Sequence, residues 1–270
     1  MTDEAQVHAM IAAACLGTTS EADFTRDLRA FLEARGVDAR DVDAITSAPP
    51  RLALYRRLVQ NNLTGVTGKM LARTRARLND LGGAFDDAFA SFLALRGPRT
   101  HYLRDVPREF LAWVEPHWRA NPRLPAWAVD LARHELVEFE IAAARARAEV
   151  PPLTEVALDR PLVLAEPLRL MHYAYAIHEL PADPSDRTEP APRPTTLLVH
   201  RDEEHLVRFL DLTPLAAAIV ARLIDGATLW ESVAAACADV GTSASEGVVA
   251  DVAKLLANLG ERGIVLGARA

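Results

Sequence analysis

The sequence predicts a mainly α-helical protein with a small α+β part near its C-terminus. Alanine and leucine abound, while aromatic residues make up only 6% of the 270 residues, a composition that favours helices. Apolar residues recur at helical spacing through the first half. Two β-type runs near residue 200 then precede three short segments that begin with good helix-capping residues.

The first half is predicted to be a succession of helices that proline and glycine delimit. The predicted starts are Ser20, which has Asp23 three residues later, Pro49-Pro50, Val106-Pro107 and Pro125. The predicted ends or kinks are Gly36, Gly65, Gly68 and Gly82-Gly83. Apolar stripes include Phe24, Leu28, Phe31, Leu32 and then Phe85, Phe89, Phe92, Leu93. We therefore expect an all-helical domain over residues 1–148, whose last and longest helix runs from Pro125 to about Ala148.

Residues 149–194 predict a connection between two domains. The stretch 151–168 contains proline and leucine without a helical period, which indicates a linker packed along a surface. Leu168 to Ile177 alternates in part between apolar and polar residues, as a strand does. The proline-rich run from Pro181 to Pro194 predicts a mobile loop.

Residues 195–270 predict a winged-helix-like domain built from a β-hairpin and three helices. The strands 195–200 and 205–212 flank a charged turn, 201–204. The helices start at Thr213, at Thr228 and at Ser243 or Ser245, which are good N-cap residue types. The run 263–266 predicts a final strand in the position of a wing.

The charge distribution disfavours a nucleic-acid-binding surface. Residues 1–150 carry 20 basic and 20 acidic side chains, whereas residues 151–270 carry 10 basic and 17 acidic ones, so the net charge of −7 lies in the second part. The third C-terminal helix, which reads DNA in a winged helix, offers only Lys254 and Arg262 as cations. Since phosphate neutralisation supplies most of the affinity for DNA, a DNA-binding transcriptional regulator is the alternative function and not the preferred one.

The chain lacks the motifs of common catalytic and metal sites. None of the eight histidines pairs with a cysteine at zinc-site spacing, and neither a phosphate loop nor a nucleophile elbow is present. His134 and Glu138 are four residues apart on a predicted helix, where an ordinary solvent-facing pair competes with metal ligation. We therefore expect no catalytic residue, no metal and no cofactor in this chain, which would not be an enzyme itself.

The sequence also predicts a cytoplasmic location. The N-terminus is acidic and has no signal-peptide pattern. No apolar stretch is long enough to span a membrane. Cys15 and Cys237 lie near opposite ends of the chain and do not suggest a disulfide framework.

The second strand of the hairpin is a candidate site for an extended peptide, which would add to the sheet at its edge. The third helix would form the far wall of the groove. The expected peptide-binding residues are Leu206, Val207, Arg208, Phe209, Leu210, Val248, Asp251, Val252 and Leu255. The alternative is that charged neighbours merely protect this edge from pairing, and the residues leave both interpretations open.

Two parts of the chain resemble known families. Residues 195–266, with the runs LDLTP, IDGAT and LWESVAAAC, are similar to PqqD-like recognition domains of ribosomal peptide biosynthesis. Residues 20–145 resemble a family that is named for a DNA-binding domain. This family includes the HvfC-like proteins. The matching runs are Arg51–Arg56, Asn61–Leu63, His101–Pro107 and Asp130–Glu135. The segment LRLMHYAYAI, the proline-rich loop and the hairpin look like the C-terminal part of that family.

The resemblance implies an accessory role in peptide modification. HvfC-like proteins resemble the MbnC/TglI-type partner subunits of multinuclear non-haem iron oxygenases of the TIM-barrel type. The chain would form a heterodimer with such an oxygenase, which would hold the iron, and its RiPP recognition element would bind the leader of a ribosomally made precursor peptide that is oxidised at Cys. The expected partner interface lies within the matching motifs or beside them, at Asn61, Asn62, His101, Tyr102, Arg104, His134 and Glu138.

Overall fold

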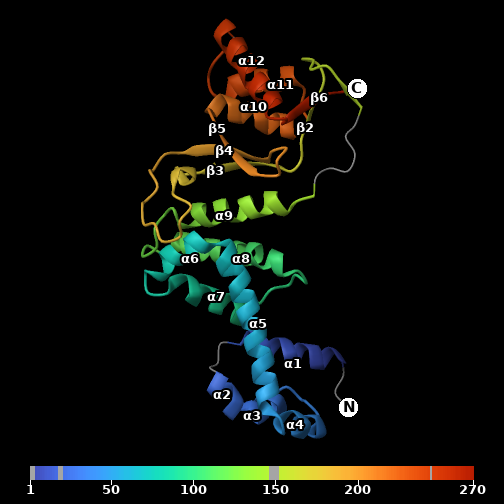
Figure 1. Ribbon diagram of the computed structural model, residues 1–270, viewed down its shortest axis with the longest axis vertical. Helices are drawn as coiled ribbons and strands as arrows, with labels where there is room; N and C mark the ends of the chain where they lie inside the picture. Colours follow the sequence, from blue (N-terminus) through green and yellow to red (C-terminus); the bar gives the residue numbers. More distant parts are fainter. Residues whose placement is uncertain (1–3, 18–20, 146–151, 244) are drawn as a thin grey trace. The chain divides into compact units, whose positions relative to one another are not determined.

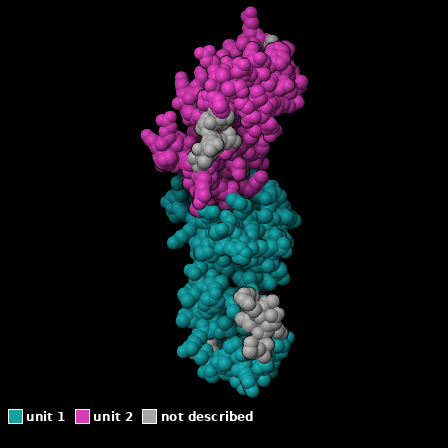
Figure 2. Space-filling view, turned by 90° about the vertical axis from the view of Figure 1, so that its right-hand side faces the viewer, with its two compact units in different colours: residues 1–132, 182–187 teal, residues 133–181, 188–270 magenta. Residues whose placement is uncertain are grey.

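The structure is a computed structural model that describes residues 4–17, 21–145, 152–243 and 245–270 (Figure 1). About 57% of it is helical, and the C-terminal region of the described chain holds two small antiparallel sheets. One compact unit comprises residues 1–132 and 182–187, and the other comprises 133–181 and 188–270 (Figure 2). The domain boundaries predicted at residues 148 and 194 stay predictions, because the compactness of the two units does not show which segments fold independently.

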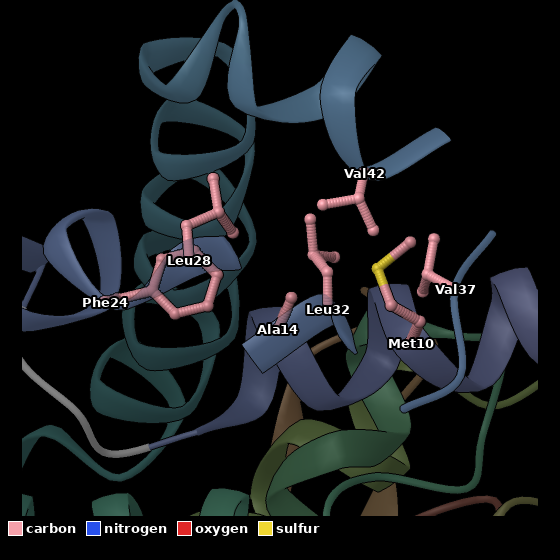
Figure 3. Close-up of a cluster of buried hydrophobic side chains, with 7 residues drawn as sticks. All are labelled: Met10, Ala14, Phe24, Leu28, Leu32, Val37 and Val42. Carbon is pink, nitrogen blue, oxygen red and sulfur yellow. The ribbon is translucent and has the colours of Figure 1, made fainter. Parts of the chain in front are cut away.

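The N-terminal part of unit 1 is a small helical cluster. It contains α1 (Glu4–Leu16), α2 (Glu21–Arg26), α3 (Leu28–Glu33), α4 (Ala39–Thr46) and the start of α5 (Pro49–Met70). Its core brings together apolar side chains from the four helices α1 to α4 and from the connection before α4, namely Met10, Ala14, Phe24, Leu28, Leu32, Val37 and Val42 (Figure 3). The predicted stripe of Phe24, Leu28, Phe31 and Leu32 does pack into one cluster, but it comes from two short helices, α2 and α3, and not from the single helix that was predicted. The predicted start at Ser20 lies outside the described residues.

Helix α5 runs unbroken through Gly65 and Gly68, so neither glycine ends the helix. The helix ends at Met70, and Leu71 then leaves helical geometry at φ −115° and ψ 44°. A Cβ at Gly68 would lie 2.5 Å from Nη1 of Arg75, whereas one at Gly65 would meet open space. Gly68 therefore makes room for Arg75, which donates hydrogen bonds of 2.8 and 3.0 Å to Asp86.

An aromatic core joins α7 (Ala84–Leu95) to α8 (Val106–Ala120). Helix α6 (Ala72–Asn79) contacts α7, and both α6 and α8 contact α5. The rings of Phe85, Phe89, Phe92, Phe110 and Trp118 have centroids 5.1–6.0 Å apart. Edge-on packing of this kind adds to the stabilisation from burial. The predicted break at Gly82-Gly83, the start at Val106-Pro107 and the phenylalanine stripe are confirmed.

The proline-rich loop has no regular secondary structure, and part of it belongs to unit 1. Asp186 accepts a hydrogen bond from Arg77 at 3.3 Å, and Arg187 forms an ion pair with Asp80. Arg77 and Asp80 lie in and just after α6, so these contacts attach residues 182–187 to that helix.

Helix α9 (Ala128–Ala143) begins three residues after Pro125 and does not reach 148. It has 16 residues, whereas α5 has 22, so the expectation that it would be the longest helix is wrong. Nη1 of Arg201 donates to the carbonyls of Ala142 and Ala144 at 3.2 and 2.8 Å. A distant side chain thus satisfies carbonyls that the end of a helix leaves without partners.

The principal sheet of unit 2 is antiparallel, with the order β3 (Leu168–Tyr173), β4 (Thr195–Arg201), β5 (Val207–Leu212). The predicted strand and hairpin are confirmed. The 133–143 part of α9 covers one face, and α10 (Pro214–Ile224), α11 (Leu229–Asp239) and α12 (Glu246–Glu261) follow on the other side (Figure 1). Leu198, Leu212, Val220, Leu259 and Ile264 form the core between the sheet and α10 and α12.

Side-chain caps begin all three C-terminal helices. Thr213 accepts from the amide of Ala216, and Thr228 forms a reciprocal capping box with Glu231. Ser245 accepts from the amide of Val248, so of the two predicted serines it is Ser245 that caps α12.

The predicted linker contributes strands instead of remaining irregular. The segments β1 (Leu153–Thr154) and β2 (Leu162–Leu164) flank β6 (Val265–Arg269) in the order β1-β6-β2. The predicted final strand is therefore present as β6. It pairs with β1 and β2 and does not form a wing beside the hairpin. Gly267 permits this close approach, because a Cβ there would lie 2.8 Å from the carbonyl oxygen of Thr154.

Candidate functional site

The outer edge of β5 is open, since no strand in the described chain pairs with it on that side. At the closed end of the hairpin, the Asp202 amide donates to the carbonyl of Leu206 at 2.9 Å. Hydrogen-bonded and non-bonded pairs alternate along an antiparallel ladder. Because Asp202 and Leu206 form a bonded pair, every second residue after Leu206 is also bonded to β4. The backbone groups of Arg208, Leu210 and Leu212 therefore face β4. The amide and carbonyl groups of Val207, Phe209 and Asp211 therefore point outward along the edge.

The side chains of Val207 and Phe209 lie on the face of the sheet that α9 covers. The ring of Phe209 stacks on His134 with a centroid distance of 4.5 Å and an interplanar angle of 26°. His134 also meets the ring of Tyr173 edge to face at 5.7 Å. His134 is only 4% exposed, so it supports β5 from inside unit 2 and does not lie on the surface expected for a partner.

The side chains of Arg208 and Leu210 lie on the opposite face, toward the C-terminal helices. Leu210 and Leu255 of α12 are half-buried against the same apolar cluster, and Val252 packs on the neighbouring cluster. Val248 is half-buried, whereas Asp251 is exposed and binds Lys254 at 3.3 Å. The structure thus divides the predicted peptide-binding residues between the two faces of the sheet.

Asp202 holds the turn that begins β5. Its carboxylate accepts from Nε of Arg208 at 2.6 Å and from the amide of Leu206 at 2.8 Å. These bonds, the Arg208 bond first, hold the pKa of Asp202 below its ordinary value. Leu206 itself is half exposed. Asp202 was not among the predicted site residues, although an acidic residue in a hairpin turn before a left-handed residue, His205 at φ 64°, is a recognisable signal.

His200 is a buried ionisable group beside the hairpin. It lies opposite Arg208 in the ladder and is 4% exposed, and its Nε2 has no hydrogen-bond partner in the described structure. Burial lowers its pKa, and the charges of Arg262 and Arg208 lower it further. The imidazole of His200 therefore favours its neutral form in the folded chain.

The other expected partner residues are exposed. Asn61 and Asn62 lie on α5, and Glu138 lies on α9 in unit 2. His101, Tyr102 and Arg104 precede α8, where the guanidinium of Arg104 lies 5.4 Å from the centre of the Tyr102 ring. Tyr102 is 63% exposed, and large exposed aromatic side chains are frequent anchors of protein interfaces.

Within the described ranges, no three His, Cys, Asp or Glu side chains group together in a way that could hold a metal ion. In the same described ranges, no helix has the length and apolar character needed to cross a membrane.

The part of the chain that carries the β5 edge matches the model of a known family. Residues 164–260 match the HvfC C-terminal domain. The HvfC match spans β3, β4, β5, α10, α11 and nearly all of α12. It confirms the HvfC resemblance for this part of the chain, whereas the resemblance of residues 20–145 stays a prediction. No curated protein matches the chain.

Proposed function

We propose that this chain is a non-catalytic partner subunit of a multinuclear non-haem iron oxygenase, and that it presents the leader of a precursor peptide to that enzyme. The observation that carries the proposal is the open β5 edge within the part of the chain that matches the HvfC C-terminal domain. In this proposal the sheet and helices α10 to α12 act as a winged-helix-like peptide-recognition module.

Strand addition supplies the binding chemistry. The outward backbone groups of Val207, Phe209 and Asp211 form a row of donors and acceptors that an extended peptide can complete. The edge is supported on both faces, because Phe209 is stacked on His134 while Leu210 packs on the opposite core. A supported edge favours binding, since little conformational freedom is lost when the peptide docks.

DNA recognition by the same module is disfavoured by the charges on α12. Lys254 already binds Asp251, and Arg262 donates to Asn258. Residues 151–270 carry more acidic than basic side chains, so the long-range potential opposes approach to a phosphate backbone.

The oxygenase would dock on exposed residues of the HvfC-like motifs, above all Tyr102 and Arg104. In this arrangement the iron and the oxidation of a peptide Cys belong to the partner enzyme. The chain binds both the peptide and the oxygenase, and this raises the local concentration of the peptide at the enzyme.

Affinity capture from the native host, followed by mass spectrometry and iron analysis, tests the proposal. We expect an iron-containing oxygenase to co-purify with the chain, together with a small peptide that contains Cys. Recovery of no protein partner, combined with retention on DNA that falls steeply with salt, would overturn the proposal and favour a transcriptional regulator.

A further inference from the structure

Unit 2 contains a pocket of about 380 Å³ that β5 does not line. Its walls come from β2, from the connection 165–167, from the first residues of β3 and from the end of α10. Since β3 and β5 are the two outer strands of their sheet, the pocket lies at the edge opposite the candidate peptide edge. Its volume falls within the range of small ligand sites.

Three arginines from separate segments line this pocket. Arg145 follows α9, Arg169 lies in β3 and Arg269 ends β6. All three side chains are exposed. Glu166 is the one carboxylate among the described lining residues, so positive charge predominates there.

None of these three guanidinium groups binds a carboxylate within the residues that the structure describes. Nη1 of Arg169 donates a long hydrogen bond of 3.4 Å to the carbonyl of its neighbour Leu168. Other arginines of the same unit are paired, as Arg208 is with Asp202 and Arg222 is with Asp239. Positive charge thus gathers at this pocket in a part of the chain where acidic side chains outnumber basic ones.

The remaining lining is apolar. Leu162 and Leu164 of β2 face the same pocket as Leu223 and Ile224 of α10. Arginine binds carboxylates through paired hydrogen bonds, and apolar walls favour a ligand that also carries aliphatic side chains. A site with both features suits an acidic peptide better than a nucleic acid, whose binding needs an extended cationic surface.

We propose that this pocket is a second binding site, which takes an acidic, leucine-containing peptide segment. The carboxylates of the segment pair with Arg145, Arg169 and Arg269, and one aliphatic side chain packs on Leu164 and Ile224. The site goes beyond the proposed function, because it uses none of the backbone groups of β5.

Fluorescence anisotropy with the full chain tests this site. The probe is a fluorescein-labelled peptide of sequence DLELDE, and the comparison peptide is its amide counterpart NLQLNQ. We expect the combined change Arg145→Gln, Arg169→Gln and Arg269→Gln to weaken binding of DLELDE about tenfold, since three exposed ion pairs are lost. We also expect NLQLNQ to bind at least about tenfold more weakly than DLELDE to the unmodified chain.

The matched control removes the same charge elsewhere. The combined change Arg96→Gln, Arg99→Gln and Arg123→Gln alters three exposed arginines of unit 1 and should leave the affinity for DLELDE within about twofold. Equal weakening by both variants, or equal affinity for the two peptides, would overturn the proposal. So would displacement of DLELDE by a DNA duplex at lower concentration than by unlabelled DLELDE.

One further variant separates this site from the β5 edge. Val207→Pro removes an outward amide of β5 and should leave binding of DLELDE unchanged. Loss of DLELDE binding in that variant would overturn the second site, whereas unchanged DLELDE binding supports it, whatever happens to binding of the precursor.

Discussion

At the residue scale, two residues that were both predicted to contact a partner differ in their surroundings once the chain is folded. Tyr102 and His134 both belong to runs for which a resemblance to HvfC-like proteins is predicted. Tyr102 is 63% exposed, whereas His134 is 4% exposed and stacked on Phe209. The motif alone does not distinguish a surface contact from a packing contact, because burial depends on segments that lie far away in the sequence.

This contrast predicts that two substitutions differ in their effect on stability. His134→Ala should lower the free energy of unfolding by about 1–2 kcal/mol, because it removes a ring stack and leaves a cavity under β5. Tyr102→Ala should change it by less than about 0.5 kcal/mol, since the ring is exposed. Urea denaturation of both variants measures these values, and equal destabilisation would contradict the assignment of His134 to the interior.

His200 predicts a dependence of stability on pH. Its pKa is lowered in the folded chain, so the unfolded chain binds more protons once the pH falls below the unfolded value of about 6.5. The free energy of unfolding should therefore decrease below that pH, with a slope of at most about 1.4 kcal/mol per pH unit, until the folded pKa is reached. His200→Leu should flatten this part of the curve, and parallel curves for the two proteins would refute the role of His200.

At the scale of elements, local signals predicted where segments begin, and distant contacts decided where they end. Thr213, Thr228 and Ser245 cap their helices as their side chains suggest. The end of α9 was not predictable in this way, because Arg201 satisfies its last carbonyls from β4. The strands β1 and β2 were missed, because two or three residues carry no period and are stabilised by β6.

The two glycines of α5 form a matched pair for substitution. Gly65→Ala should stabilise the chain by about 0.5–1 kcal/mol, because alanine restricts the unfolded chain and meets nothing in the folded one. Gly68→Ala should stabilise the chain less than Gly65→Ala does, or should destabilise it, because the new Cβ would displace Arg75 from Asp86. Thermal unfolding of both variants tests this, and equal stabilisation would show that Arg75 yields without cost.

The geometry of β5 sharpens the test of strand addition. The amide of Val207 points outward, so Val207→Pro should leave the ladder to β4 intact, as proline is tolerated at such positions of edge strands. Binding of the precursor leader should fall by at least about tenfold, since an outward donor is lost and the ring obstructs the edge. Arg208→Pro is the contrast, because it removes a bond to β4 and should destabilise the hairpin.

Calorimetric titration of the leader, together with circular dichroism of each variant, gives both readouts. A folded Val207→Pro chain that binds the leader with unchanged affinity would eliminate strand addition at this edge.

At the scale of the whole molecule, the proposal assigns the two binding roles to different surfaces. The peptide edge lies in unit 2, within the part that matches the HvfC C-terminal domain. The proposed contacts Tyr102 and Arg104 lie in unit 1. The two roles should therefore be separable by substitution.

The combined change Tyr102→Ala and Arg104→Ala should weaken binding of the oxygenase by about tenfold or more and preserve binding of the leader. Val207→Pro should have the converse effect. Surface plasmon resonance with each partner measures both affinities, and a variant that loses both while remaining folded would indicate a single shared surface.

The sequence by itself determined the helical character of the first half, the hairpin and its charged turn, and the caps of the last three helices. These features depend on side-chain periodicity and on contacts within a few residues. Only the tertiary structure decided that β5 has an open edge, that its outward groups belong to Val207, Phe209 and Asp211, and that three arginines line one pocket. Strand order and the convergence of distant segments depend on long-range pairing, and such pairing leaves no periodic trace along the chain.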